Sequence, residues 1–158
     1  MISSNAKWIW VNSHPQKNEY AYFEGEYDWS GEKVRLFLAA ETDYILYVNE
    51  KRVAFGQFAG YPTEKYYDEI DLAPHSQNGN NRIRITVRYE GINCATHIDD
   101  GAGAIFSLRV GERDILWSNE NTKGGYDNRY LQHLDRKITV QLGLTSGMRS
   151  GNEFIESE

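Results

Sequence analysis

Short segments of the chain alternate hydrophobic and polar residues, which is the pattern of half-buried β-strands. In the segment 34–40, every second residue is apolar and shares one face: Val34, Leu36, Leu38 and Ala40. The clearest one-sided segment is 82–89, whose apolar face consists of Ile83, Ile85, Val87 and Tyr89. Its other face carries Arg82, Arg84 and Arg88, which we interpret as the solvated side of a strand rather than a binding stripe.

Similar segments recur along the chain and are separated by polar turns. Strands are predicted at residues 8–11, 20–27, 34–40, 44–48, 52–55, 69–72, 82–90, 104–110, 115–117 and 137–142. Residues 119–127 contain Gly124 and Gly125 and are expected to form a loop. Because helical periodicity is absent and many short strands recur, the sequence predicts an all-β fold, an antiparallel jelly-roll β-sandwich.

A hairpin is expected where the segment 44–48 is followed by Asn49-Glu50-Lys51 and then by 52–55. Tyr44, Leu46 and Val48 share one face of the first strand. Asn tolerates the positive φ that a two-residue turn demands, so Asn49 is predicted to be a turn residue.

The length of 158 residues fits one domain. Residues 1–144 are assigned to the sandwich, and residues 145–158 to a mobile tail or linker stub. The formal charge is −6, with no broad cationic field to attract phosphate backbones, so nucleic acid is not expected as a partner. A neutral glycan is compatible with this charge.

The chain shows no apolar run long enough to cross a membrane and no export signal at its start, so no membrane partner is expected. As given, it would stay in the cytoplasm, although an export signal would be missing from a piece of a longer protein. The single cysteine, Cys94, excludes an internal disulfide framework and is expected to be structural.

The most concentrated polar cluster is the segment 97–103, which begins His97-Ile98-Asp99-Asp100-Gly101 and lies close to Asn93. Adjacent carboxylates with an Asn and loop carbonyls are oxygen ligands of the kind that calcium requires. We therefore take Asp99 and Asp100 as candidate calcium ligands, and Asn93 and His97 as candidate ligand-binding residues. The alternative is a solvated Asp-Asp-Gly turn, since Asp and Gly favour turns for conformational reasons alone.

Aromatic residues are abundant, with 11 Tyr, 4 Trp and 6 Phe, and their rings can stack on the apolar faces of sugars. Those in or beside loops are candidates for ligand binding: Tyr61, Tyr66, Tyr67 and Trp117. Those within predicted strands are expected to serve packing: Trp8, Tyr44, Tyr47 and Tyr89.

Catalytic signatures are weak. Glycoside hydrolysis needs two carboxyl groups about 5 to 9.5 Å apart, one with a raised pKa, and no pair of acids in the chain is specific for that arrangement. Signatures of activated nucleophiles and of zinc proteases are missing, and the four His residues are scattered. No catalysis is expected from this segment alone.

In order and residue type, the segment 34–88 resembles one known family. A strand ending Ala39-Ala40-x-x-x-Tyr44-x-Leu-Tyr-Val-Asn49 precedes Tyr67-Asp68-x-x-x-Leu72 and then Asn81-x-Ile-x-Ile85. This order is similar to the amino-terminal β-sandwich module of the alpha-L-rhamnosidase family of glycoside hydrolases. That family usually has Gly after the Asn, where this chain has Glu50.

The resemblance covers residues 6–117 and implies a galactose-binding-like accessory domain of a rhamnosidase-like hydrolase. Such a domain binds carbohydrate or shapes access of a rhamnose-containing glycan, and it contacts the catalytic domain of its parent protein. In the family the catalytic carboxylates belong to a separate helical domain, and one carbohydrate-binding relative uses calcium to hold rhamnose. The alternatives are a module that packs against a catalytic domain without binding sugar, and a stand-alone enzyme. Tyr44, Asn49, Tyr67 and Asp68 match the family pattern and are interpreted as fold determinants.

Overall fold

The computed structural model describes residues 1–56, 66–92 and 101–134, together with the backbone of residues 137–139, 143–144, 146–150 and 153–157. In chain order the elements are β1 (Glu19–Trp29), β2 (Val34–Glu41), β3 (Asp43–Val48), β4 (Lys51–Gly56), β5 (Asp68–Asp71), the 3-10 helix η1 (Ala73–His75), β6 (Gly79–Tyr89), β7 (Gly103–Val110), β8 (Arg113–Trp117), β9 (Lys123–Tyr126), β10 (Lys137–Thr139), β11 (Gly143–Leu144), β12 (Ser146–Ser150) and β13 (Glu153–Ser157).

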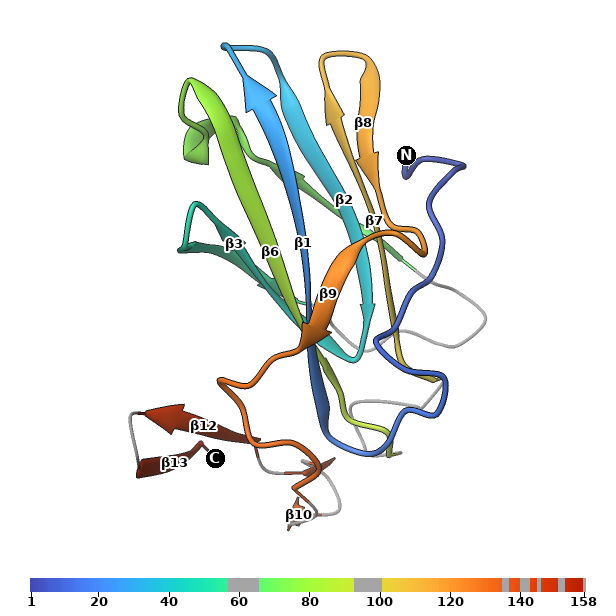
Figure 1. The fold of residues 1–158 in the computed structure, drawn as a ribbon, viewed down its shortest axis with the longest axis vertical. Coiled ribbons are helices and arrows are strands. Elements are labelled where there is room, and N and C mark those ends of the chain that lie inside the picture. The colour runs from blue at the N-terminus through green and yellow to red at the C-terminus, as the bar shows by residue number, and fades with distance from the viewer. Residues whose placement is uncertain are drawn as a thin grey trace.

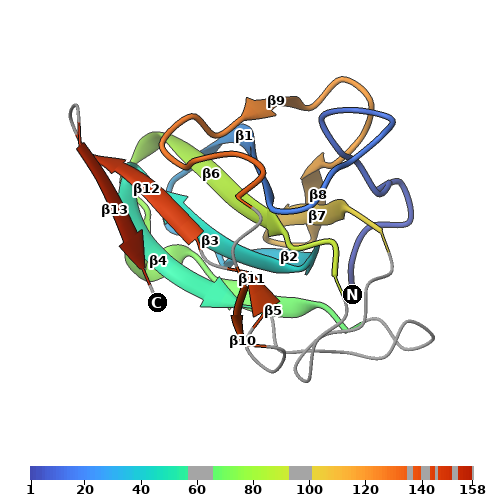
Figure 2. The same cartoon turned by 90° about the horizontal axis from the view of Figure 1, so that it is seen from below.

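Two antiparallel sheets form a sandwich. One sheet has five strands in the order β4-β3-β6-β1-β9, and the other has four in the order β5-β2-β7-β8. Figures 1 and 2 show β1, β6 and β9 in one layer and β2, β7 and β8 in the other. The chain crosses between the sheets after β1, β2, β4, β5, β6 and β8. The predicted all-β antiparallel sandwich is confirmed.

The inner faces of the sheets meet in one core, as the alternation of the sequence predicts. Val34, Leu36, Leu38 and Ala40 from β2 face Ile83, Ile85 and Val87 from β6, and all are buried. Burial of this apolar surface supplies most of the stabilisation of a sandwich of this size. The predicted inward faces of these strands are therefore confirmed.

The hairpin of β3 and β4 is also confirmed. Val48 pairs with Lys51, so Asn49 and Glu50 form the two-residue turn, and both have positive φ angles of 49° and 70°. The Asn49 side chain fixes this turn to β6, because its Oδ1 accepts from Arg82 N and its Nδ2 donates to Asn81 Oδ1. Asn49 is thus a fold determinant, as its match to the family pattern indicated.

Tyr44 and Asp68 join the two sheets. Tyr44 Oη on β3 donates a 2.6 Å hydrogen bond to Asp68 Oδ2 on β5. Burial and the neighbouring carboxylate both raise the pKa of Tyr44, so this hydroxyl keeps its proton. The interpretation of Tyr44 and Asp68 as structural residues is confirmed.

The amino-terminal segment differs from its prediction as a strand. Only Ile9 pairs, through an isolated bridge to Ala104 on β7. Trp8 is 45% exposed, and its ring lies against Gly103, where an added Cβ would come within 2.8 Å of Trp8 Cε3. Trp10 turns inward and contacts Phe23 and Tyr89 edge-to-face. Ser3 N donates to Ser107 Oγ and Lys7 N to Ser118 O, so this segment lies along β7 and β8 (Figure 1).

The carboxy-terminal region adds strands where a loop and a tail were expected. Residues 123–126 form β9 and pair with β1, so the predicted loop is wrong there. β10 covers the first half of the predicted strand 137–142. Residues 146–150 and 153–157 pair as β12 and β13. The domain boundary at residue 144 stays a prediction.

Gly124 explains why a Gly-Gly pair forms a strand here. A Cβ at this position would lie 2.6 Å from Tyr22 O and 2.7 Å from Phe23 Cδ1, too close for any other residue type. The pair of glycines is typical of a loop in sequence, but here the missing side chain permits the close approach of β9 to β1.

Gly124→Ala should lower the free energy of unfolding by about 1–3 kcal/mol, because its Cβ meets backbone that cannot move aside. Gly125→Ala is the matched control in the same strand, since its Cβ would lie 3.4 Å or more from Tyr22, an ordinary contact. Urea unfolding of both variants measures the difference, and equal stabilities would contradict the close packing of β9.

Candidate functional site

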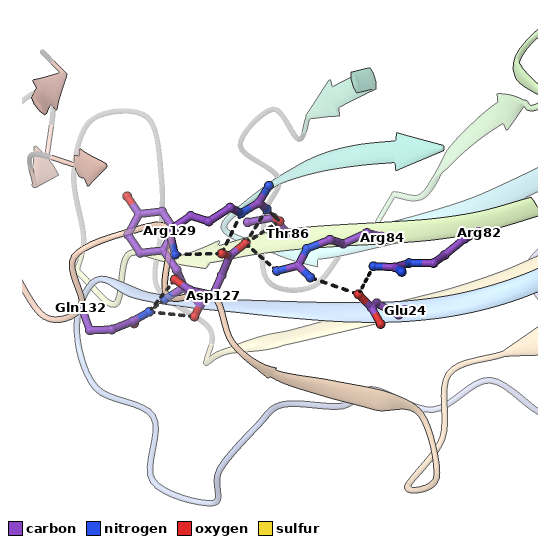
Figure 3. Close-up of polar contacts among 8 residues, drawn as sticks. Glu24, Arg82, Arg84, Thr86, Asp127, Arg129 and Gln132 are labelled. Carbon is purple, nitrogen blue, oxygen red and sulfur yellow. Dashed lines mark hydrogen bonds and ion pairs between the residues drawn. The ribbon is translucent and has the colours of Figure 1, made fainter. Parts of the chain in front are cut away.

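The outer face of the five-stranded sheet carries a network of charged and aromatic side chains. On β1 and β6 these residues alternate with the core residues, and the register places Glu24 opposite Arg84 and Tyr22 opposite Thr86. Figure 3 shows Glu24, Arg82, Arg84, Thr86, Asp127 and Arg129 in one connected network. The predicted solvated face of this strand holds only for Arg82, since Thr86 is buried and the Arg84 and Arg88 side chains are only 23% and 18% exposed.

Glu24 is one of two buried carboxylates in this network. Its side chain is 7% exposed and accepts from Arg82 Nη2 at 2.9 Å, from Arg84 Nη1 at 3.0 Å and from Lys123 Nζ at 3.1 Å. Burial alone would raise the pKa of Glu24, but the bonds from Lys123 and Arg84 and the charge of Arg82 lower it below its ordinary value. Glu24 is therefore ionised at neutral pH.

Asp127, which directly follows β9, is the second carboxylate and is fully buried. Arg129 binds it in a bidentate manner, with Nε to Oδ1 at 2.9 Å and Nη2 to Oδ2 at 2.6 Å. Thr86 Oγ1 donates to Oδ2 at 2.8 Å, and Arg84 Nη2 lies 3.5 Å from the same oxygen. Burial raises the pKa of Asp127, but the bonds from Arg129 and Thr86 outweigh it and lower the pKa.

Gln132 holds the segment that carries Asp127 against β1. Its Oε1 accepts from Tyr20 N, and its Nε2 donates to Tyr20 O and to Asp127 O. The ring of Tyr130 stacks on Tyr20 with centroids 4.4 Å apart. Burial raises the pKa of Tyr130 to about 12. These contacts fix the position of Arg129 over the outer face of the sheet.

A third buried carboxylate, Glu19 at the start of β1, joins the segment before β1 to the segment after β9. It accepts from Trp10 Nε1 at 2.9 Å and from Asn12 Nδ2, and it lies 3.1 Å from His133 Nε2. Burial raises the pKa of Glu19, but these hydrogen bonds lower it overall. This carboxylate has a structural role outside the network around Asp127.

The network borders a pocket of about 310 Å³ lined by Tyr47, Glu50, Arg82, Arg84 and Arg129. The Arg129 guanidinium lies 5.0 Å from the Tyr47 ring centroid, and the Arg84 guanidinium lies 3.9 Å from the Tyr22 ring. The pocket thus combines guanidinium donors, a carboxylate acceptor and an aromatic side chain. Polar groups of both kinds around a concave surface are suited to a ligand rich in hydroxyl groups.

The two buried carboxylates beside the pocket do not have the pKa pattern of a glycosidase pair. One carboxyl group of a glycosidase pair must keep its proton at working pH through a raised pKa. Glu24 and Asp127 have the opposite property, because their arginine and lysine partners lower both pKa values. Both carboxylates are therefore fixed, ionised groups.

The structure describes three of the predicted ligand-binding residues: Tyr66, which is exposed, and Tyr67 and Trp117, which belong to the other sheet. Tyr67, next to β5, is 42% exposed and contacts Phe37 edge-to-face at 5.9 Å. Trp117 ends β8 and pairs with Ser107. None of the three lines the pocket. The other candidates lie outside the described residues and stay predictions: Tyr61, Asn93, His97, Asp99 and Asp100.

The pocket residues were assigned other roles from the sequence. Tyr47 was expected to serve packing, but it is partly exposed and lines the pocket, whereas Tyr44 and Tyr89 are buried as expected. Strand alternation could have found Tyr47, Arg82 and Arg84, since all are out of phase with the core residues. No sequence pattern pointed to Arg129.

The described residues form neither a metal-binding cluster nor a membrane-spanning helix. In residues 1–56, 66–92 and 101–134, no three His, Cys, Asp or Glu side chains gather in a way that could hold a metal ion. The candidate calcium ligands Asp99 and Asp100 lie outside these ranges. Within the same part of the chain, no helix has the length and hydrophobicity of a membrane span.

The fold is similar to part of several alpha-L-rhamnosidases. No protein-family model matches the sequence, and no curated protein matches it. The GH78 family rhamnosidase of Bacillus sp. GL1 superimposes with a TM-score of 0.83 over 91% of this chain at 22% identity. The alpha-L-rhamnosidase of Dictyoglumus thermophilum matches 84% of this chain with a TM-score of 0.62 and 18% identity. That of Streptomyces avermitilis, solved in complex with L-rhamnose, matches 78% with a TM-score of 0.57 and 20% identity.

This chain spans only 16%, 18% and 12% of those three proteins, respectively. The resemblance expected from the sequence is therefore confirmed as a structural match to a small part of the alpha-L-rhamnosidases. At these identities the match establishes the β-sandwich fold and leaves ligand and activity to be argued from the site.

Asp127→Asn should lower the free energy of unfolding at pH 7 by about 3 kcal/mol, because it leaves Arg129 without its buried counter-charge. The gap to the wild type should shrink as the pH falls from 7 to 3. A carboxylate whose pKa is lowered in the folded state stabilises the fold above its unfolded pKa, and acid removes that contribution. Urea unfolding across this pH range measures both effects. The exposed Asp28→Asn in β1 serves as control, and a gap that stays constant with pH would contradict the role of Asp127.

Glu50→Gly should raise the free energy of unfolding by about 0.5–1 kcal/mol, because glycine adopts the positive φ of this turn without steric cost. Lys51→Gly, one residue further and at the start of β4, should lower it by about 0.5–1 kcal/mol. Thermal unfolding of the two variants shows whether the two changes in stability have opposite signs. A destabilised Glu50→Gly would show that the Glu50 side chain holds the turn together.

Proposed function

We propose that this chain is a non-catalytic carbohydrate-binding domain of an alpha-L-rhamnosidase-like glycoside hydrolase, and that the pocket on the five-stranded sheet holds the sugar. The observation that carries the proposal is the pocket of Tyr47, Glu50, Arg82, Arg84 and Arg129. The fold also supports the proposal, because it matches part of the rhamnosidases, one of which was solved with L-rhamnose.

The chemistry of the pocket suits a sugar. Sugar hydroxyls donate to carboxylates and accept from guanidinium groups, while C–H faces of the ring pack on aromatic side chains. Glu50 supplies the acceptor, the three arginines supply donors, and Tyr47 supplies a ring and a hydroxyl. Because Arg84 and Arg129 are already fixed by Glu24 and Asp127, binding would immobilise few additional side chains.

A module that packs against a catalytic domain without binding sugar is the second candidate. Large aromatic side chains at the surface favour it: Phe55 is 72% exposed and Tyr66 is 68% exposed. Exposed apolar side chains mark a protein-binding surface where they form a contiguous patch. In a rhamnosidase-like parent the partner would be the catalytic domain, and both roles can coexist on different faces.

Isothermal titration of the domain with L-rhamnose and D-galactose, with and without calcium, tests the proposal. Saturable binding is expected for the wild type. Arg82→Ala should weaken it at least about tenfold, a loss of about 1.4 kcal/mol, because a charged donor at the pocket is removed. Arg113→Ala, exposed on β8 in the other sheet, is the matched control and should bind as the wild type does.

The loop candidates are tested in the same experiment with an Asp99→Ala and Asp100→Ala double variant. Binding that survives Arg82→Ala but is lost in the double variant, or that requires calcium, would move the site to residues 93–100. No heat with either sugar would favour the packing module.

A further inference from the structure

Among the described residues that line the pocket, Glu50 is the one acid, and its neighbours there are three arginines. Guanidinium groups bind carboxylates strongly because their paired N–H donors match both oxygens. Without Glu50, such a pocket would therefore favour an acidic sugar. The identity of this single residue changes which sugars the pocket favours.

The buried carboxylates under the pocket neutralise only part of the positive charge of the arginines. Glu24 pairs with Arg82, Arg84 and Lys123, and Asp127 pairs with Arg84 and Arg129. Within these ion pairs of the described residues, four cations share two buried carboxylates, so the pairs carry an excess of positive charge under the pocket. The Arg82 and Arg129 side chains remain 48% and 41% exposed, so a ligand can reach them. Glu50 opposes this excess at the pocket surface.

The backbone conformation at residue 50 is unfavourable for Glu, which suggests that the side chain has a role. Its φ of 70° lies in the left-handed region, which disfavours residues with a Cβ and favours glycine at this position of a two-residue turn. Among the residues that the structure describes, no hydrogen bond or ion pair of the Glu50 carboxylate compensates for this conformation. An acidic side chain held in strained backbone at the edge of a pocket points to a role in binding.

We propose that Glu50 sets the selectivity of the pocket, so that it takes neutral sugars and rejects sugar acids such as uronates. This inference rests on the proposed function. The Glu50 carboxylate accepts hydrogen bonds from hydroxyls of a neutral sugar, and it repels a carboxylate that would otherwise bind the arginines. Glu50 thus determines specificity through both an attractive and a repulsive contact.

Titration with matched sugars tests this assignment. D-galactose and D-galacturonate differ only at C6, which bears a hydroxyl in the first and a carboxylate in the second. The wild type should bind L-rhamnose or D-galactose more tightly than D-galacturonate. In Glu50→Gln, which keeps the size of the side chain and removes its charge, the affinity for D-galacturonate relative to the neutral sugar should rise at least tenfold.

Two further variants exclude trivial explanations. Glu112→Gln removes the same charge from the exposed turn between β7 and β8, and it should leave the ratio unchanged. Glu50→Gly should shift the ratio as Glu50→Gln does and should also unfold at a higher temperature, so a damaged fold cannot explain the result.

The outcomes separate the two proposals. Sugar binding with an unchanged ratio in Glu50→Gln, or a wild type that prefers D-galacturonate, overturns the role of Glu50 and leaves the carbohydrate-binding function standing. No binding of any of the three sugars by the wild type and by Glu50→Gln overturns both.

Discussion

Burial of Asp127 on the outer side of a β-sheet is the constraint on which the site depends. A charge removed from water must be paired and hydrogen-bonded, or it strongly destabilises the fold. Three side chains meet this requirement for Asp127: Arg129 from the same segment, and Arg84 and Thr86 from β6. The pairing holds the segment after β9 against the sheet, and it fixes two of the three arginines that line the pocket.

The two faces of β6 explain how one strand serves both the fold and the site. Ile83, Ile85 and Val87 lie in the core, while Arg82 and Arg84 between them line the pocket. Because the core side locks the register, the outer side chains are held on rigid backbone rather than on a loop. The Asn49 side chain bonds to Asn81 and Arg82 and so fixes the turn between β3 and β4 to β6. This attachment places Glu50 at the edge of the pocket.

The sequence predicts the inner half of this molecule better than the outer half. Alternation identified the core faces of β2, β3 and β6, since burial of apolar residues at every second position is a local signal. It missed β9, because the glycines that let this strand approach β1 are those that usually mark a loop. The Asn49 turn followed from the tolerance of Asn for positive φ, and the structure confirms it. The resemblance to the rhamnosidase module marked Tyr44 and Asp68 as fold determinants but did not predict the hydrogen bond between them.

The pocket itself could not be predicted from the sequence, because residues far apart in the chain pair to form it. Arg84 and Glu24 lie 60 residues apart in the chain, and Thr86 and Asp127 lie 41 apart. Nothing local shows that these residues meet, so the arginines of β6 were interpreted as a solvated face. The loop candidates at residues 93–100, by contrast, were chosen for composition alone, and they remain predictions.

An NMR titration of the isotopically labelled domain with L-rhamnose and D-galactose tests the central claim most directly, since it reports where a sugar binds. A pocket on the five-stranded sheet requires shifts centred on Tyr47, Glu50, Arg82, Arg84 and Arg129. Shifts centred on residues 93–100, or on Tyr67 and Trp117 of the other sheet, would contradict it, as would a spectrum that neither sugar changes.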